Sequence, residues 1–202
     1  MREAARFGLF GGSFDPVHRG HVEIAEAARR ELRLDRVLFL PTSDPPHKRP
    51  RWATALQRYC MVELALLDHP ALEVSTHELT PGRRAFTVDT VQHFRRELPG
   101  ASLFLLIGAD SFLELDQWRR FEELVAEVEL VVLARPGYEA AVDQAPPRLA
   151  AALGGRPLHR IDRRVDVSST ELRRRLAAGE LPGPEVLPSP VLQFIRKYSL
   201  YR

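Results

Sequence analysis

Short apolar runs alternate with longer amphipathic segments along most of this chain. The runs that predict buried strands lie at residues 7–10, 37–40, 102–110 and 130–133. Residues 72–75 alternate like a strand, and residues 158–161 predict a short last strand. Apolar positions recur with helical spacing at residues 19–34, 53–68, 88–98, 111–115 and 187–198. Strands that alternate with helices are typical of an α/β protein. We therefore expect a Rossmann-like, doubly wound, mostly parallel sheet with helices on both faces.

The turn between the first predicted strand and helix carries the strongest chemical signal. It reads Gly-Gly-Ser-Phe-Asp-Pro-Val-His-Arg-Gly-His over residues 11–21. Backbone amides at a glycine-rich turn beside a helix N-terminus favour phosphate. His18 and His21 share one face of the first helical turn, and Gly20 lets a ligand approach the backbone. The alternatives are two surface histidines or a zinc-binding pair, but no further ligand cluster lies at suitable spacing for zinc.

Further polar residues follow other predicted strands, at the edge where open α/β sheets bind ligands. Lys48 lies in a proline-rich loop, where it is either a point charge for a phosphate or a solvated lysine. Gly108 permits close backbone approach at the end of its strand. Asp110 can contact a ribose hydroxyl or cap the next helix, and the two roles can coexist. Thr87 can cap the helix at 88–98.

A second phosphate site is predicted near the C-terminal helices. Ser168 followed three residues later by Glu171 forms a capping box, which is a purely structural reading of those two residues. That reading does not explain Ser169, Thr170 and Arg173. Hydroxyls and backbone amides at a helix start, with a guanidinium one turn on, are typical of a phosphate site.

Composition narrows the class of protein. The chain has 202 residues, 45% hydrophobic and 28% charged, which predicts one domain over residues 1–202 with a helical C-terminal part from about 168 to 202. The net charge is +2 and most arginine pairs fall beside acids, so we expect no nucleic-acid partner. No apolar run reaches the ~20 residues of a membrane span. With Cys60 as the single cysteine, we expect a cytoplasmic protein without a membrane partner, and a homo-oligomer stays open.

These motifs resemble those of the His-x-Gly-His nucleotidyltransferases, and among them bacterial nicotinate-nucleotide adenylyltransferases. The likeness rests on the turn ending in His18 and His21, on Pro-His-Lys at 46–48, on Gly-Ala-Asp followed by Trp118, and on Ser-Ser-Thr-x-x-Arg at 168–173. It covers nearly the whole chain. It implies transfer of AMP from ATP to nicotinate mononucleotide, giving deamido-NAD and pyrophosphate, with Mg²⁺ delivered with ATP and no metal ligands in the protein.

The resemblance also implies roles for single residues. His21 would act at the α-phosphate with help from His18, while Lys48 and Arg173 would hold the β- and γ-phosphates. The expected ATP-binding residues are Gly11, Gly12, Ser13, Phe14, Gly20, Gly108, Asp110, Ser168, Ser169 and Thr170. The expected nicotinate mononucleotide-binding residues are Asp15, Phe86, Thr87, Trp118 and Arg135. Backbone amides near Thr87 would meet the nicotinate carboxylate, and the Trp118 indole would stack on the pyridine ring, although residue type alone favours a core tryptophan.

The residue types fit a reaction without a general base. The acceptor phosphate is already a nucleophile, so catalysis would rest on in-line positioning and on neutralising charge at the phosphates. Two other classes remain: an adenylyltransferase for nicotinamide mononucleotide or phosphopantetheine, and a non-catalytic nucleotide-binding regulator. Turnover would separate the enzymes from the regulator.

Overall fold

A single parallel sheet organises the chain in a computed structural model that describes residues 4–43, 52–79, 86–134, 145–163 and 167–202. The strand order is β3-β2-β1-β4-β5-β6, and every pairing is parallel. The strands are β1 (Arg6–Gly12), β2 (Arg36–Pro41), β3 (Leu72–Val74), β4 (Ser102–Gly108), β5 (Glu129–Leu133) and β6 (Leu158–Ile161). This arrangement confirms the predicted Rossmann-like doubly wound sheet.

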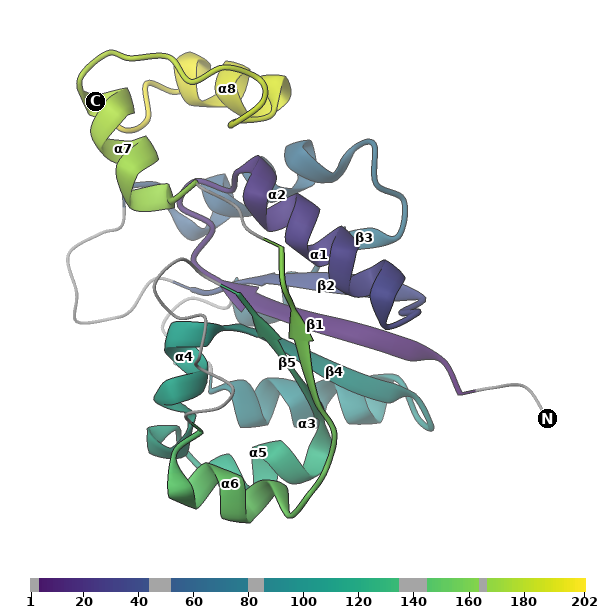
Figure 1. The fold of residues 1–202 in the computed structure, drawn as a ribbon. Coiled ribbons are helices and arrows are strands. Elements are labelled where there is room, and N and C mark those ends of the chain that lie inside the picture. Colours follow the sequence, from purple (N-terminus) through teal and green to yellow (C-terminus); the bar gives the residue numbers. More distant parts are fainter. Residues whose placement is uncertain (1–3, 44–51, 80–85, 135–144, 164–166) are drawn as a thin grey trace.

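Helices cover both faces of the sheet (Figure 1). On one side lie α1 (Arg19–Glu31), α2 (Ala55–Leu66), α7 (Ser169–Ala177) and α8 (Ser189–Lys197). On the other lie α3 (Thr87–Glu97), α4 (Ala109–Leu113), α5 (Phe121–Glu127) and α6 (Pro147–Leu153). Two 3₁₀ turns, η1 (His77–Leu79) and η2 (Leu115–Gln117), complete the described elements.

Strand β4 shows why two cores form. Its side chains alternate in direction, as in any strand. Phe104 and Leu106 pack in the cluster that includes residues of α1, α2 and α8, whereas Leu103, Leu105 and Ile107 pack in the cluster that includes residues of α3 and α5. Because both faces are covered, the strand reads as one continuous apolar run in the sequence.

The order of the strands reverses at β1. After β1, the next two strands, β2 and β3, lie on one side of it. The chain then continues through α3 to β4, which pairs with β1 on its other side. At such a switch point the connections leave in opposite directions, which opens a crevice beyond the carboxyl ends of the strands. The predicted site residues that follow β1 and β4 flank this crevice.

Two predicted details of local structure are wrong. Thr87 is the first residue of α3, and its N-cap is Phe86. The N-cap of α4 is Gly108, whose extended backbone (ψ 152°) lets the helix begin directly after β4, so Asp110 lies inside the first turn. Trp118 directly follows η2, where the backbone becomes extended (φ −74°, ψ 150°).

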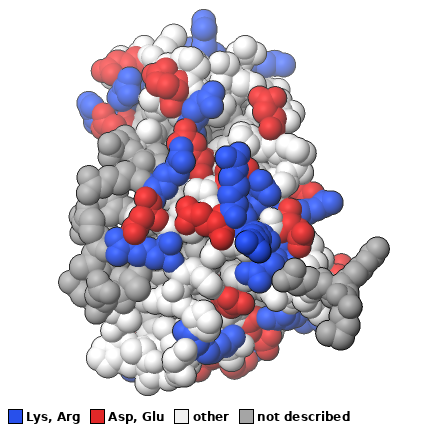
Figure 2. All heavy atoms as spheres, turned by 45° about the vertical axis from the view of Figure 1, so that its right-hand side comes forward, with Lys and Arg blue, Asp and Glu red and all other residues white. Residues whose placement is uncertain are grey.

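Charged side chains of both signs are mixed on the face shown in Figure 2. Some pairs lie along one helix, such as Arg29 and Arg30 with Glu26 at 2.8 Å in α1. Exposed pairs of this kind contribute little to stability. No helix in the described ranges has the length and apolarity that a membrane crossing requires.

Candidate active site

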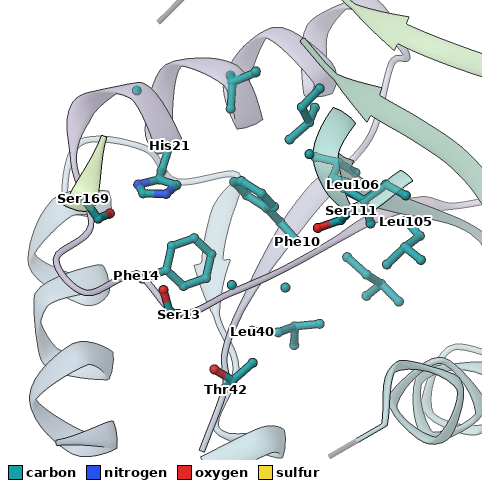
Figure 3. A pocket seen from close by; sticks show the side chains of 18 of the residues that line it. Phe10, Ser13, Phe14, His21, Leu40, Thr42, Leu105, Leu106, Ser111 and Ser169 are labelled. Atoms are coloured by element: carbon teal, nitrogen blue, oxygen red, sulfur yellow. The ribbon is translucent and has the colours of Figure 1, made fainter. Parts of the chain in front are cut away.

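A cavity of about 910 Å³ opens at the carboxyl ends of the strands. Its wall includes the ends of β1, β4 and β5, one face of α1 and of α3, and the start of α7. Figure 3 shows Phe10, Phe14 and His21 at this cavity with Ser169 near them. Elements that are distant in the sequence thus meet around one hollow.

The two histidines at the start of α1 have different settings. His18 is the N-cap of the helix and is buried, while His21 lies one turn on. Their rings lie face to face, with centroids 3.7 Å apart and planes inclined by 32°. The backbone N–H of His18 donates to Nδ1 of His21 at 3.3 Å. A nitrogen that accepts carries no proton, so the neutral His21 ring holds its proton on Nε2 and can donate there.

The turn before α1 needs a glycine and a residue with unusual backbone geometry. Phe14 has a positive φ of 47°, in the left-handed region that non-glycine residues rarely adopt. A Cβ on Gly12 would lie 2.9 Å from the tip of the Phe14 ring. The ring itself packs edge-on against His21 at 5.1 Å between centroids. Gly12 therefore makes room for the ring that supports His21.

A buried arginine joins two walls of the cavity. Arg58, in α2, has no exposed surface. Its guanidinium donates to the carbonyl of Ser13 at 2.8 Å and to that of Thr42 at 2.6 Å. It also donates to the carbonyl of Ala53 at 3.3 Å. Arg58 thus fixes the chain after β1 to the chain after β2.

The C-terminal part of the chain holds the turn from the other side. Tyr201 is buried and donates from its hydroxyl to Asp15 Oδ1 at 2.6 Å. Arg173 donates to the carbonyl of Asp15 at 2.6 Å, and Ser169 donates to that of Pro16 at 2.9 Å. Three bonds therefore fix the two residues at the centre of the turn.

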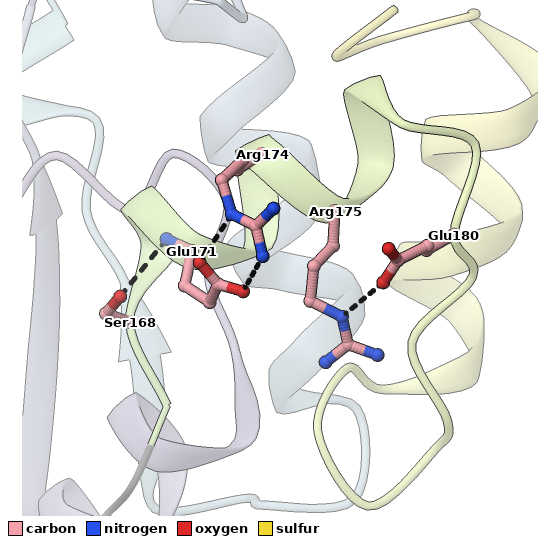
Figure 4. Close-up of polar contacts among 5 residues, drawn as sticks. All are labelled: Ser168, Glu171, Arg174, Arg175 and Glu180. Carbon is pink, nitrogen blue, oxygen red and sulfur yellow. Dashed lines mark hydrogen bonds and ion pairs between the residues drawn. The ribbon is translucent and has the colours of Figure 1, made fainter.

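The start of α7 presents polar groups to the cavity. Ser168 caps the helix by accepting from the N–H of Glu171 at 3.1 Å (Figure 4). The Glu171 carboxylate pairs with Arg174 at 2.6 Å, so it does not complete the predicted capping box. Arg173 donates to the Thr170 hydroxyl at 3.0 Å. The Thr170 and Arg173 side chains both line the cavity. They lie at the N-terminus of α7, where the helix dipole favours anions.

Another part of the cavity wall is built by α3 and the segment after η2. Thr87 and Trp118 both line it. Arg119 lies over the Phe86 ring at 4.4 Å, and Arg120 pairs with Asp89 at 3.0 Å. These contacts hold the Trp118 segment against the first turn of α3.

Comparisons with known proteins agree with this arrangement. A family model described as cytidylyltransferase-like matches residues 9–175. A protein of Herpetosiphon aurantiacus named "Probable nicotinate-nucleotide adenylyltransferase" is 38% identical over 97% of this chain and 98% of its own length. One of Laribacter hongkongensis with the same name is 41% identical over 96% of this chain and 94% of its own. The chain belongs to the cytidylyltransferase-like family, among the nicotinate-nucleotide adenylyltransferases.

A solved structure shares the fold. It is the nicotinic acid mononucleotide adenylyltransferase of Plasmodium falciparum in complex with NaAD, with a TM-score of 0.79 at 16% identity. The match covers 98% of this chain and 97% of that one. It supports the architecture of the sheet and its helices.

Most of the residues predicted from the family motifs line the cavity. They are Gly11, Gly12, Ser13, Phe14, His18, Gly20, His21, Thr87, Gly108, Trp118, Ser168, Ser169, Thr170 and Arg173. Lys48 and Arg135 lie outside the described residues. These residues therefore lie around one cavity, while their individual roles stay predictions.

Three predicted binding residues do not line the cavity that the described residues form. The Asp15 carboxylate is buried beneath the turn, where it accepts from Tyr201. The Phe86 ring is covered by the Arg119 guanidinium. The Asp110 side chain has one oxygen fully buried in the first turn of α4. Each has a structural setting that the motif alone did not indicate.

Among the polar residues in or around this site that sequence reasoning missed are Arg58, Glu78 and Tyr201. Arg58 had a readable signal, because it shares a helix face with the buried Met61 and Val62. A charged residue on an apolar face predicts a buried polar contact. Glu78 and Tyr201 had no comparable signal, since their partners Thr90 and Asp15 are set by the fold.

The bond between Tyr201 and Asp15 predicts sensitivity to alkali. Burial, and then the charge of Asp15, raise the pKa of the Tyr201 hydroxyl above its usual value. A raised folded-state pKa gives stability that is complete below the unfolded pKa of about 10 and is lost as the pH rises above it. We expect Tyr201→Phe to lower the free energy of unfolding by about 1.5–3 kcal/mol at pH 8. Above pH 10, the free energies of unfolding of the native chain and the variant should approach each other by about 1.4 kcal/mol per pH unit.

Urea unfolding between pH 8 and pH 11 would measure this. Tyr198→Phe is the matched control, because that ring is 51% exposed. A constant difference between native and Tyr201→Phe across the whole range would contradict the prediction.

Proposed function

We propose that this chain transfers AMP from ATP to nicotinate mononucleotide, forming deamido-NAD and pyrophosphate. The observation that carries the proposal is that one cavity joins three features: the paired histidines of α1, the polar start of α7 and the Trp118 end beside α3. The first two fit phosphates and the third fits a flat ring. Family membership among nicotinate-nucleotide adenylyltransferases supports the same reaction.

His21 is the residue proposed to act on the transferred phosphate. Its Nδ1 accepts from the backbone of His18, so Nε2–H is the donor that can meet an oxygen of the α-phosphate. The acceptor phosphate is already a nucleophile, so no proton needs to be removed. Charge builds on the phosphate oxygens in the transition state, and a fixed donor stabilises it more than the ground state.

The leaving pyrophosphate is proposed to lie at the start of α7. Ser168, Ser169 and Thr170 surround the helix N-terminus, and Arg173 adds a positive charge at the cavity wall. His18 and Lys48 are proposed to assist on the same phosphates. The amides of the turn at Gly11–Phe14 complete the phosphate end.

The acceptor is proposed to lie at the other end. The Trp118 indole would stack on the pyridine ring, and the amides at the start of α3, near Thr87, would meet the nicotinate carboxylate. Arg135 is proposed near the acceptor phosphate. For Asp15, Phe86 and Asp110 we propose supporting roles behind the cavity wall, because each is engaged there.

Magnesium is proposed to enter as part of the substrate MgATP. Within the described residues, no group of three or more His, Cys, Asp or Glu side chains could hold a metal ion. The proposal rests on the chemistry of ATP, whose phosphates bind Mg²⁺ readily. We also propose that residues 1–202 form one domain, because the C-terminal part bonds directly to the turn at Asp15 and Pro16.

Pyrophosphate release tests the reaction. We expect the chain to turn over MgATP with nicotinate mononucleotide, more slowly with nicotinamide mononucleotide, and not with phosphopantetheine. Faster turnover with nicotinamide mononucleotide would support the same adenylyl transfer but with the amide as the acceptor. No turnover with any acceptor, together with ATP binding, would instead indicate a nucleotide-binding regulator.

A further inference from the structure

One acidic side chain of the cavity has no part in the proposed reaction. Glu78, in η1, lines the cavity but is only 7% exposed. Its Oε1 accepts from the Thr90 hydroxyl at 2.7 Å. A buried carboxyl in a substrate cavity needs a physical reason, because moving a charge out of water is costly.

Nothing in the described part of the chain neutralises this carboxyl. No described arginine, lysine or histidine forms an ion pair with it, and Thr90 is the hydrogen-bond partner that the structure gives it. Burial accordingly raises the pKa of Glu78, against the opposing effect of the Thr90 bond. Structural acids in protein interiors are normally paired, so this one is suited to a ligand.

The position of Glu78 indicates which part of a ligand it meets. Thr90 follows Thr87 by one helical turn on the same face of α3, and both line the cavity. Trp118 lines it as well, on the segment held to the first turn of α3 through Arg119 and Arg120. Glu78 therefore belongs to the part of the cavity wall built by α3 and the Trp118 segment, where the acceptor ring is proposed to lie.

We propose that Glu78 is the counter-charge of the acceptor's pyridinium ring and a determinant of its recognition. This rests on the proposed function, in which the acceptor is a pyridine mononucleotide. The ring nitrogen of such a nucleotide is bonded to ribose, so the ring carries a fixed positive charge. A buried carboxylate attracts that charge strongly in a medium of low dielectric constant, while the Trp118 face supports the same cation.

The ring substituent is a poorer partner for Glu78 than the ring. The nicotinate carboxylate would be repelled by a second carboxylate, and the positive end of α3 at Thr87 offers it a better place. Glu78 lies one helical turn further along, at Thr90. The ring and its carboxylate would thus meet two different groups, Glu78 in η1 and the start of α3.

Binding of the oxidised and reduced forms of nicotinate mononucleotide tests the proposal, because the 1,4-dihydro ring is neutral. Glu78→Gln keeps the shape and the bond to Thr90 but removes the charge. We expect this variant to bind the oxidised form at least tenfold more weakly than the native chain does, and to bind the reduced form within twofold of the native affinity. Glu97→Gln is the matched control, because Glu97 is an exposed acid at the end of α3, the helix that carries Thr90. Thr90→Val frees the Glu78 carboxyl to move. It should weaken binding of the oxidised form, but less than Glu78→Gln does.

Trp118 can report binding without turnover. The chain has two tryptophans, and Trp52→Phe removes the other, which is 55% exposed. Quenching of Trp118 emission then follows the ligand in each variant, and circular dichroism confirms that each is folded. The proposal would be overturned if Glu78→Gln weakened the binding of both ring forms equally or left both unchanged. It would also be overturned if the variant changed only the preference between the acid and the amide. A native chain that binds neither mononucleotide would instead overturn the proposed function.

Discussion

His21→Ala is expected to lower kcat for pyrophosphate release by about 10²–10³-fold, equivalent to ~2.7–4 kcal/mol of transition-state stabilisation. The imidazole is held by the His18 backbone and by the edge of the Phe14 ring, so its Nε2 proton has a fixed direction before substrate arrives. Alanine removes that donor and leaves the rest of the turn in place. The effect should therefore lie in kcat, with the KM for ATP nearly unchanged.

His21→Gln and His69→Ala make this result specific. Glutamine places a neutral amide donor near the position of Nε2 and should retain more activity than alanine. His69 lies outside the cavity lining, so its loss should leave kcat unchanged. Equal kcat for the native chain and His21→Ala would show that His21 does not act on the transferred phosphate and contributes only to packing.

Arg58→Met is expected to have the largest effect on stability. Methionine fills much of the space but cannot donate, so the carbonyls of Ser13, Thr42 and Ala53 each lose a bond. Each buried group without a partner costs about 1–3 kcal/mol, and partial access to water in the cavity reduces the sum. We expect a total of about 3 kcal/mol, which lowers the melting temperature by about 6–12 °C for a chain of this size.

Thermal unfolding beside Arg30→Met would measure this loss. The Arg30 side chain is 73% exposed and pairs with Glu26 on the surface, so its replacement should shift the melting temperature by no more than about 2–4 °C. Arg58→Met should also raise the KM for ATP, since two of its carbonyl partners belong to the cavity walls. An unchanged melting temperature would show that those carbonyls find other donors.

Much of the fold could be predicted because parallel strands covered on both faces are continuous apolar runs. The apolar run at 130–133 misses one residue of β5, and the short strand predicted at 158–161 coincides with β6 although its two central residues are polar. Element ends were less predictable. Ala109 continues the apolar run of β4 but belongs to α4, because the chain turns at the edge of the sheet and not where the residue type changes.

The site was predictable where function needs a local pattern. The glycines, histidines and hydroxyls at 11–21 and 168–173 must lie close together in the chain to form a helix start, so short motifs carry them. Arg58, Glu78 and Tyr201 act through partners that only the fold brings near. No local pattern could pair Tyr201 with Asp15, because the two are 186 residues apart.

That separation has a consequence for how the protein acquires its binding cavity. The bonds from Ser169, Arg173 and Tyr201 to the turn span 153, 158 and 186 residues of chain. Contacts so far apart in sequence form slowly, because the intervening chain must lose its freedom first. A folding intermediate with β1 and α1 in place would still have an unfixed histidine turn. Ligand binding during refolding would then appear only with the last, slowest phase, well after secondary structure.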